Sequence, residues 1–260
     1  MPNTWLTPTP QKEPRIWRLS SSAVLLFVSA CSKFIFSLNK PKVYGKEAFK
    51  SFVAKRPQNK PLVTISNHYS MIDDFLVSYM LPWKQLMKRT SIRWLPGAKD
   101  VCTRTKSSTL FFQLGRVVPV VRGDGVYQYC MDFCVDRLND GDWVHIYPEG
   151  LVNTTKEFMR LKWGVGRLIA DSEMTPIVLP YWHVGMDNVF PTRIPYYPRM
   201  GKKVTVVIGE PIDFEEDLKR LREQKKTDEE IRKYITDKIQ DVFESLKIET
   251  EKKHNETVDM

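Results

Sequence analysis

Five short runs rich in β-branched residues recur along this chain and constrain its fold more than any other feature. They cover residues 61–66, 116–121, 142–147, 176–181 and 203–208, and the segments between them have helical patterns. Strands that alternate with helices form mainly parallel sheets, because each helix returns the chain to the same edge. The sequence therefore predicts an α/β fold with a mainly parallel, mixed sheet flanked by helices.

The length of the chain, 260 residues, suits one such domain with a full hydrophobic core. Residues 1–15 contain several prolines, so they predict a flexible arm without helix. Residues 41–250 form the predicted main domain, which ends in a helix with one apolar stripe at Ile231, Ile235 and Ile239. Residues 251–260 predict a polar, frayed tail.

Between the arm and the main domain, residues 16–40 are apolar but are interrupted by Arg18 and Lys33. The uncharged run at 19–32 is shorter than the roughly 18–20 residues that a membrane-spanning helix needs. On a helix the polar residues draw a thin stripe, which predicts an interfacial helix lying in one membrane leaflet; a helix packed on a soluble core is the alternative. The residues expected against lipid are Trp17, Leu25, Leu26, Phe27 and Phe34.

The net charge of +9 favours an anionic partner, of which nucleic acids and anionic lipids are the common kinds. The chain has no zinc-finger spacing, no aromatic RNA-binding block and no long basic run, so we expect no nucleic-acid partner. A membrane surface is the predicted partner. The four cysteines are scattered and have no histidine pair at metal-ligand spacing, so no metal site is expected.

A histidine and two carboxylates follow the first strand-like run, 61–66. Asn67 and His68 come directly after it, and Asp73 lies five residues beyond His68. A histidine at a strand end with a carboxylate in reach predicts a general base and its orienting partner. A spacing of five is not that of one helix face, so the pair needs a turn between its members. Asp74 is a rival partner, and a core histidine with a structural role is the alternative.

Two further runs end in polar residues beside glycine. Arg122 and Gly123 follow the run at 116–121, where a guanidinium is suited to holding a phosphate; an ordinary surface arginine is the alternative. Glu149 and Gly150 follow the run at 142–147. Glu149 is interpreted as a ligand for a glycerol hydroxyl, a partner of Arg122 or a group that orients His68; a cap for a following helix is the alternative.

The order of these blocks resembles the glycerolipid acyltransferase superfamily. Its Asn-His-x-x-x-x-Asp motif is matched at residues 67–73, its phosphate-binding arginine at Arg122, and its Phe-Pro-Glu-Gly motif at residues 147–150 with Tyr147 in the first position. Leu151 departs from the threonine or base that many members have there. The resemblance implies an acyltransferase-like fold and catalytic roles for His68 and Asp73. The residues that it implies in substrate binding are Asn67, Arg122, Gly123, Glu149 and Gly150.

Longer segments narrow the resemblance within that superfamily. Residues 123–128, 141–146, 162–170 and 179–186 are similar to a mitochondrial group that exchanges acyl chains between phospholipids and lysophospholipids without coenzyme A. The likeness implies cardiolipin and monolysocardiolipin as substrates, and an interfacial anchor on mitochondrial membranes that face the intermembrane space. It implies no metal and no organic cofactor.

Two other functions fit the same residues. A coenzyme A-dependent lysophospholipid or glycerol-phosphate acyltransferase would need the same histidine and aspartate. A non-catalytic protein that binds anionic lipid is the alternative from another class, although the intact pair of His68 and Asp73 argues against it. The sequence leaves open the acyl-chain specificity, a homo-oligomeric state, and whether His68 acts as base or nucleophile.

Overall fold

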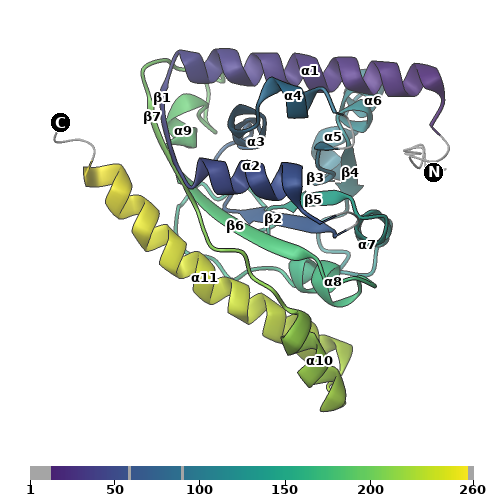
Figure 1. The fold of residues 1–260 in the computed structure, drawn as a ribbon. Coiled ribbons are helices and arrows are strands. Elements are labelled where there is room, and N and C mark those ends of the chain that lie inside the picture. Colours follow the sequence, from purple (N-terminus) through teal and green to yellow (C-terminus); the bar gives the residue numbers. More distant parts are fainter. Residues whose placement is uncertain (1–12, 58–59, 89–90, 257–260) are drawn as a thin grey trace.

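Five strands form the main sheet, described here from a computed structural model that covers residues 13–57, 60–88 and 91–256. The strands are β1 (Lys40–Tyr44), β2 (Leu62–Ser66), β5 (Trp143–Ile146), β6 (Ile177–Val184) and β7 (Lys203–Ile208). Their order is β1-β7-β6-β2-β5, and among these neighbours only β6 and β7 pair antiparallel (Figure 1). The predicted mixed, mainly parallel sheet is therefore confirmed.

A short parallel pair, β3 (Leu95–Ala98) and β4 (Val117–Val120), extends this sheet beyond β5. The connection is a parallel bridge between Trp94 and Val144, with a hydrogen bond of 2.8 Å from the His145 amide to the Trp94 carbonyl. Because β2, β3, β4, β5 and β6 run in one direction, their carboxyl ends meet at one edge. Ligands in open α/β sheets bind at such an edge.

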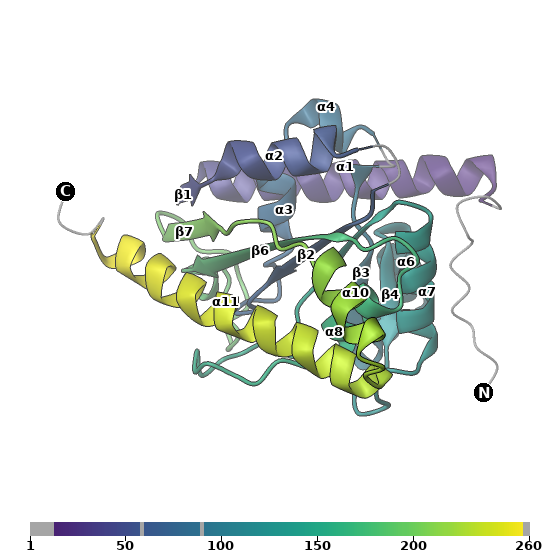
Figure 2. The same cartoon turned by 60° about the horizontal axis from the view of Figure 1, so that its bottom comes forward.

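Helices from the first 90 residues, together with the later helix α9, cover one face of the sheet (Figures 1 and 2). They are α1 (Arg15–Ser37), α2 (Lys46–Lys55), α3 (Phe75–Met80), α4 (Trp83–Leu86) and α9 (Met186–Val189). Their apolar side chains pack against one set of alternating strand residues, including Leu62, Trp143 and Leu179. The small helices α5 (Lys99–Cys102) and α6 (Lys106–Leu114) lie beside β3 and β4, and α6 also contacts α1.

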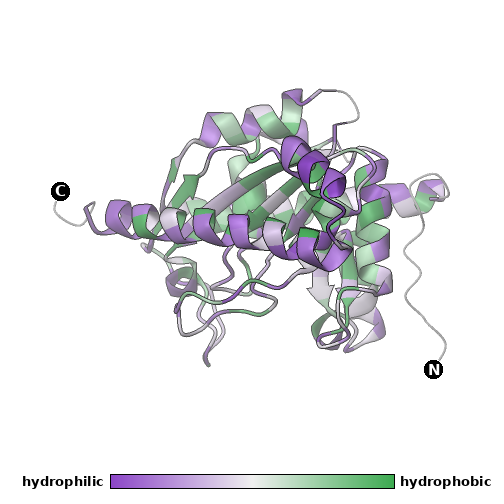
Figure 3. Ribbon diagram, turned by 90° about the horizontal axis from the view of Figure 1, so that it is seen from below, coloured by the Kyte–Doolittle hydropathy of each residue, from purple (hydrophilic) through white to green (hydrophobic). Residues whose placement is uncertain are grey.

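The opposite face is covered by α7 (Tyr129–Asn139), α8 (Gly164–Ala170), α10 (Glu215–Glu223) and α11 (Asp228–Glu256). The other set of strand residues points into this layer, with Val63, Val144 and Trp182 inside the larger core cluster. Figure 3 shows α11 crossing the apolar sheet with a largely hydrophilic outer surface. The result is a three-layer α/β/α arrangement, because alternate residues of each buried strand face different helical layers.

The long helix α1 packs on α3 and α6 through an unexpected face. Its buried side chains include Ser21, Ser29 and Ser32, whose hydroxyls donate to the carbonyls of Leu114, Leu25 and Phe75. The opposite face exposes Ile16, Leu19, Phe27 and Phe34, each more than 60 % accessible. The helix therefore packs through serines together with Leu25 and Phe36, and presents other aromatic and aliphatic residues outward.

The predicted lipid-facing residues divide between these two faces. Phe27 and Phe34 lie on the exposed face, and Trp17 and Leu26 are half-buried. The expectation that Leu25 faces a bilayer is wrong, because this side chain is only 7 % exposed and packs into the core against α3. The helix is long and apolar enough to cross a membrane by length and composition alone.

The two ends of the chain differ from the predicted boundaries. The arm predicted at residues 1–15 lies outside the described residues up to position 12. The frayed tail predicted from residue 251 is wrong through Glu256, because α11 continues to that residue. Ion pairs one turn apart, such as Lys247 with Glu251 at 2.9 Å, and a 2.9 Å hydrogen bond between Thr205 Oγ1 and His254 Nδ1 hold this last part of the helix.

Candidate active site

His68 lies just past the carboxyl end of β2, at the edge where the parallel strands meet. The imidazole stacks on the ring of Tyr147, which follows β5, with ring centroids 4.0 Å apart. Its Nδ1 lies 2.9 Å from Oδ2 of Asp73, and its side chain remains 19 % exposed. When Nδ1–H donates to the carboxylate, the lone pair is on Nε2, which is the tautomer that a general base needs.

Asp73 is held by the turn between β2 and α3. Its Oδ2 also accepts the backbone N–H groups of Tyr69 at 2.6 Å and Ser70 at 2.8 Å. A turn at residues 71–74 and a helix that begins at Phe75 bring the carboxylate back over five residues, as the spacing required. The fixed carboxylate can therefore orient the His68 ring.

The rival carboxylate, Asp74, has another partner. It pairs with the guanidinium of Arg93, which donates through Nε at 2.7 Å and through a second, shorter contact from Nη2. Such a two-point pair is the geometry that arginine prefers with a carboxylate. Asp73 is thus the partner of His68, and Asp74 belongs to a separate buried ion pair.

A second histidine lies behind Asp73. His183, in β6, is fully buried, and its Nε2 is 3.5 Å from Oδ2 of Asp73 and 3.1 Å from the carbonyl oxygen of Asn67. Because a carbonyl only accepts, the hydrogen of His183 is on Nε2 and points to the oxygen-rich side. Burial alone raises the pKa of Asp73, but His183 and His68 outweigh that effect and hold the pKa well below its ordinary value. The carboxylate stays ionised between two rings.

Asn67 joins two neighbouring strands and is fully buried. Its Nδ2 donates to the carbonyl of His183 at 2.9 Å, and its Oδ1 accepts the amide of His183 at 2.9 Å. Both ends of the amide are therefore bonded to backbone. This geometry favours a positioning role for Asn67, which fixes the residues on either side of Asp73, over the predicted contact with substrate.

Glu149 lies beneath the histidine with only 2 % of its surface exposed. Its Oε1 accepts the backbone N–H of His68 at 3.2 Å, so it contributes to placing the catalytic turn. Burial raises the pKa of Glu149 above its ordinary value, and the contacts with Asn153 and with the His68 amide oppose the rise. The alternative role as a helix cap is wrong, because the next helix, α8, begins only at Gly164.

Arg122 is not in contact with the histidine. It follows β4, is 51 % exposed, and pairs with Asp100 at 3.1 Å. Since β4 lies three strand positions from β2 along the same edge, the spacing of about 4.8 Å per strand separates the two strand ends by about 14 Å. Gly123 and Gly150 both have positive φ, at 84° and 75°, and turn the chain next to Arg122 and Glu149. Substrate contacts for these residues stay predictions.

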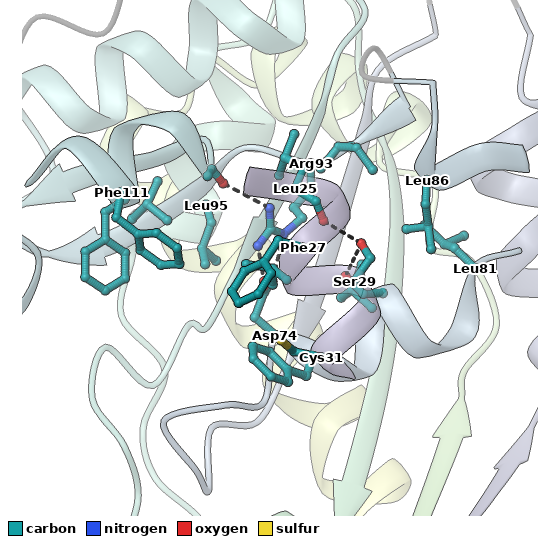
Figure 4. Close-up of a pocket in the computed structure, with 18 of the residues that line it drawn as sticks. Leu25, Phe27, Ser29, Cys31, Asp74, Leu81, Leu86, Arg93, Leu95 and Phe111 are labelled. Carbon is teal, nitrogen blue, oxygen red and sulfur yellow. Dashed lines mark hydrogen bonds and ion pairs between the residues drawn. The ribbon is translucent and has the colours of Figure 1, made fainter. Parts of the chain in front are cut away.

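An apolar cavity of about 240 Å³ opens next to the catalytic turn (Figure 4). It lies between α1, α3 and α6, and Met71 and Asp74 of the turn form part of its wall. Other lining residues include Leu25, Phe27, Leu81, Leu95 and Phe111. Phe27, Met71 and Phe111 are themselves exposed, so the cavity reaches the surface on the apolar side of α1. Its apolar walls suit part of an apolar chain, next to the turn that carries His68.

Several residues of this site were not recognised from the sequence as functional. His183 lies in none of the sequence motifs, and the pairing of Ser66 with Tyr181 places the residues after β2 beside it in β6. His145, which is fully buried, bonds Thr64 Oγ1 at 2.8 Å, and burial lowers its pKa to about 3. Among the described residues no group of three or more possible metal ligands is found.

Comparison with known proteins agrees with this geometry. Residues 40–184 match the acyltransferase family. The chain is 43 % identical to Drosophila melanogaster tafazzin over 253 residues, covering 97 % of this chain and 67 % of that protein. It is 37 % identical to the N-acylphosphatidylethanolamine synthase of Arabidopsis thaliana over 201 residues, covering 75 % of this chain and 71 % of that protein.

A solved structure has the same fold. The 1-acyl-sn-glycerophosphate acyltransferase PlsC of Thermotoga maritima superposes with a TM-score of 0.57 at 17 % identity, covering 87 % of this chain and 79 % of that chain. The fold, the family match and the paired histidine and aspartate define an acyltransferase. Within that class, the chain belongs to the tafazzin family.

Proposed function

We propose that this protein is a coenzyme A-independent transacylase that moves acyl chains from phospholipids to lysophospholipids, with cardiolipin and monolysocardiolipin among its substrates. The observation that carries the proposal is the 2.9 Å contact of His68 with Asp73 beside an apolar cavity that α1 covers. A base on a turn whose residues Met71 and Asp74 line an apolar cavity suits a substrate with a reactive polar centre and a long apolar chain.

In this mechanism Nε2 of His68 removes the proton from a hydroxyl of the lysophospholipid as that oxygen attacks the donor's ester carbonyl. Asp73 stabilises the imidazolium that forms. The tetrahedral intermediate then expels the donor's glycerol oxygen, which takes the proton back from His68. One ester bond is broken and one is formed, so the reaction needs no activated donor and runs in both directions.

The cavity and α1 support a donor that stays in the membrane. The exposed face of α1 gathers apolar side chains, whereas its buried face is attached to α3 and α6 along the length of the domain. A helix attached sideways in this manner lies in the interface and does not cross the bilayer. The donor chain can then enter the cavity from the leaflet. By likeness to the family, we propose that this membrane is mitochondrial and faces the intermembrane space.

On the headgroup side, we propose that the substrate contacts Arg122, Gly123, Glu149 and Gly150. Arg122 is exposed at the same edge of the sheet as His68, where a guanidinium can bind a phosphate that is held about 14 Å away. A phospholipid headgroup with two phosphates spans such a distance more readily than one with a single phosphate. This supports cardiolipin as a substrate. In the proposed complex, a phosphate displaces Asp100 from Arg122.

The test incubates purified protein with monolysocardiolipin and acyl-labelled phosphatidylcholine in the absence of coenzyme A. We expect label in cardiolipin with the wild type, and a rate lowered about 10²- to 10⁴-fold in His68→Ala, because the base is lost. His254→Gln is the matched control, since that histidine bonds Thr205 and not a residue of the turn, and it should retain activity.

Two further arms separate the alternatives. Label that moves only from acyl-coenzyme A would show a coenzyme A-dependent acyltransferase and contradict the proposal. Phosphatidylethanolamine as acceptor tests transfer to an amine, the chemistry named for the Arabidopsis relative. No transfer from either donor, with vesicle binding intact, would favour a non-catalytic lipid-binding protein.

A further inference from the structure

A loop far from α1 in the sequence lies against its C-terminal end. This loop, residues 191–200, contains Pro191, Pro195 and Pro198 and is called the proline loop. It connects α9 to β7, and the Gly201 amide just after it donates to the carbonyl of Leu38 at 2.8 Å. The Lys202 amide donates to Asn39 Oδ1, also at 2.8 Å. The loop is thus anchored to the residues that end α1.

The proline loop exposes four large apolar or aromatic side chains within seven residues. Ile194 is 82 % exposed, Met200 68 %, Tyr196 55 % and Tyr197 54 %. Single exposed apolar residues need no explanation, but such a group on one loop marks an interaction site. The backbone is held by hydrogen bonds from Arg199 N–H to the Val189 carbonyl at 2.7 Å and from Tyr197 N–H to the Pro195 carbonyl at 3.2 Å.

The exposed surface of the loop is continuous with that of α1. A shallow hollow of about 380 Å³ lies between them, lined on one side by Cys31, Phe34, Ile35 and Leu38, and on the other by Pro198, Arg199 and Met200. Phe34 and Met200 are both among the most exposed apolar side chains of the described residues. A surface that contacts α1 through Phe34 therefore lies next to Met200 of the proline loop.

The charge of the proline loop indicates which kind of surface the loop contacts. Arg193 and Arg199 lie within it and Lys202 follows, while no acidic residue occurs between Asp187 and Glu210. Tyrosines, an exposed isoleucine and unopposed bases fit the headgroup region of an anionic bilayer, where the rings and methyl groups are buried and the bases meet phosphates. A second protein would have to supply an apolar patch ringed by acids.

We propose that the proline loop is a second membrane-contacting element, which inserts Ile194 and Met200 beside α1 into the headgroup region of an anionic phospholipid bilayer. The proposal rests on the proposed function in one respect, that the bilayer also holds the substrate. The loop follows Phe190, whose carbonyl accepts the Ser70 hydroxyl at 2.8 Å, so it is linked to the turn that carries His68 and Asp73. Two contacts, α1 and the loop, then fix the orientation of the catalytic turn against the bilayer.

The first experiment compares the full-length chain with two double variants that change the same residue types. Ile194→Ser with Met200→Ser alters the loop, and Ile248→Ser with Met174→Ser is the matched control at positions 63 % and 44 % exposed elsewhere. Cosedimentation with phosphatidylcholine vesicles containing phosphatidylglycerol should show partitioning lowered about tenfold for the loop variant and unchanged for the control. Equal partitioning of the two variants would overturn the proposal.

A second measurement reads the depth of the loop without any mutation of its other residues. A polarity-sensitive dye on Ile194→Cys, in a Cys31→Ser background, should shift its emission to the blue when the same vesicles are added. The dye on Ile248→Cys should not shift. A silent dye at position 194 would contradict the proposal. A change in oligomeric state caused by the loop variant, with no change in vesicle binding, would instead point to a second copy of the chain as the occupant.

Neither readout depends on acyl transfer. If the transacylase assay fails while the dye at position 194 shifts, the membrane contact stands and the reaction is wrong. If transfer from phosphatidylcholine occurs while the dye is silent and the two double variants bind alike, the reaction stands and the loop is no membrane contact.

Discussion

The two long helices of the molecule are built on opposite principles. Helix α11 buries an aliphatic and aromatic stripe, including Ile235, Ile239 and Phe243, and turns charged residues outward. Helix α1 buries serines beside Leu25 and Phe36, and it exposes Phe27 and Phe34. Water on the outer side explains α11, because apolar burial stabilises a helix on a soluble domain. The proposed membrane contact explains α1 by the same rule, because its exposed aromatic side chains would then be buried in lipid.

The largest expected effect is a difference in the free energy of unfolding between a variant of α11 and a variant of α1. Phe243→Ala removes a fully buried ring of α11 and should lower the free energy of unfolding by about 3–5 kcal/mol. Phe27→Ala, on the exposed face of α1, should change it by no more than about 0.5 kcal/mol. Urea denaturation of both variants measures the difference. Similar losses would mean that Phe27 packs inside the folded protein and that the contrast is false.

The next effect concerns membrane affinity, which variants of α1 should lose and a variant of α11 should keep. Phe27→Ser and Phe34→Ser should each lower partitioning into anionic vesicles about tenfold, because each removes a ring from the apolar phase. Ile248→Ser is the control on α11, where this side chain is 63 % exposed. Vesicle cosedimentation checks the ranking, and a loss for Ile248→Ser equal to that for Phe27→Ser would remove the distinction between the helices.

A smaller effect tests the buried serine face of α1. Ser32→Ala deletes a hydroxyl that donates to the Phe75 carbonyl at 2.6 Å, and should lower the free energy of unfolding by about 1 kcal/mol. Ser22→Ala is matched to it, since the Ser22 hydroxyl bonds Arg18 within the helix near solvent, and should have little effect. Thermal unfolding followed by circular dichroism distinguishes the two. A neutral Ser32→Ala would mean that this face is held by packing alone.

The smallest effect is a pH dependence at the C-terminal end of α11. Burial, with Lys203 nearby, lowers the pKa of His254 below its ordinary value of 6.5. The neutral ring therefore favours the docked helix above that value, and this contribution is lost as the pH falls below 6.5 toward the lowered pKa. Amide hydrogen exchange around residue 254 should be faster at pH 5.5 than at pH 7.5 after correction for intrinsic rates. His254→Gln should abolish the difference, whereas α1 should show none.

The sequence predicted those parts of the fold whose signal is local. The strands β2, β4, β5, β6 and β7 were recognised because β-branched residues dominate them. Strands β1 and β3 were missed because they read Lys-Pro-Lys-Val-Tyr and Leu-Pro-Gly-Ala, in which proline, glycine and lysine hide the pattern. Proline and lysine are typical of edge strands, which is the position of β1.

The face of α1 could not be predicted, because hydropathy ranks serine as polar and places it outside. The structure places Ser29 inside, since its small hydroxyl bonds the helix's own carbonyl and allows α3 to approach. Lys33, also expected in the polar stripe, donates to the carbonyls of Tyr79 and Leu81 at the end of α3. Partners from another helix decide both positions, and a single helical pattern does not contain them.

The candidate site shows the same division between local and distant information. The turn from His68 to Asp73 is predicted by their spacing of five residues. The choice of Asp73 over Asp74 depends on Arg93, which pairs with Asp74 and lies nineteen residues beyond it. The contribution of His183 depends on a partner 116 residues away in the sequence. Residues that act through strand pairing are recognised only when the register is known.

The cavity beneath α1 implies that, in the proposed reaction, the substrates reach the enzyme by diffusion within the membrane leaflet. Because Phe27, Met71 and Phe111 at its opening are exposed on the apolar side of the helix, we propose that an acyl chain enters the cavity directly from the bilayer. The quantity that sets the velocity is then the mole fraction of lysophospholipid in the leaflet. Adding inert lipid to the vesicles slows the bound enzyme, whereas diluting the whole suspension only changes how much enzyme is bound. For such a protein, the composition of the bilayer takes the place of substrate concentration.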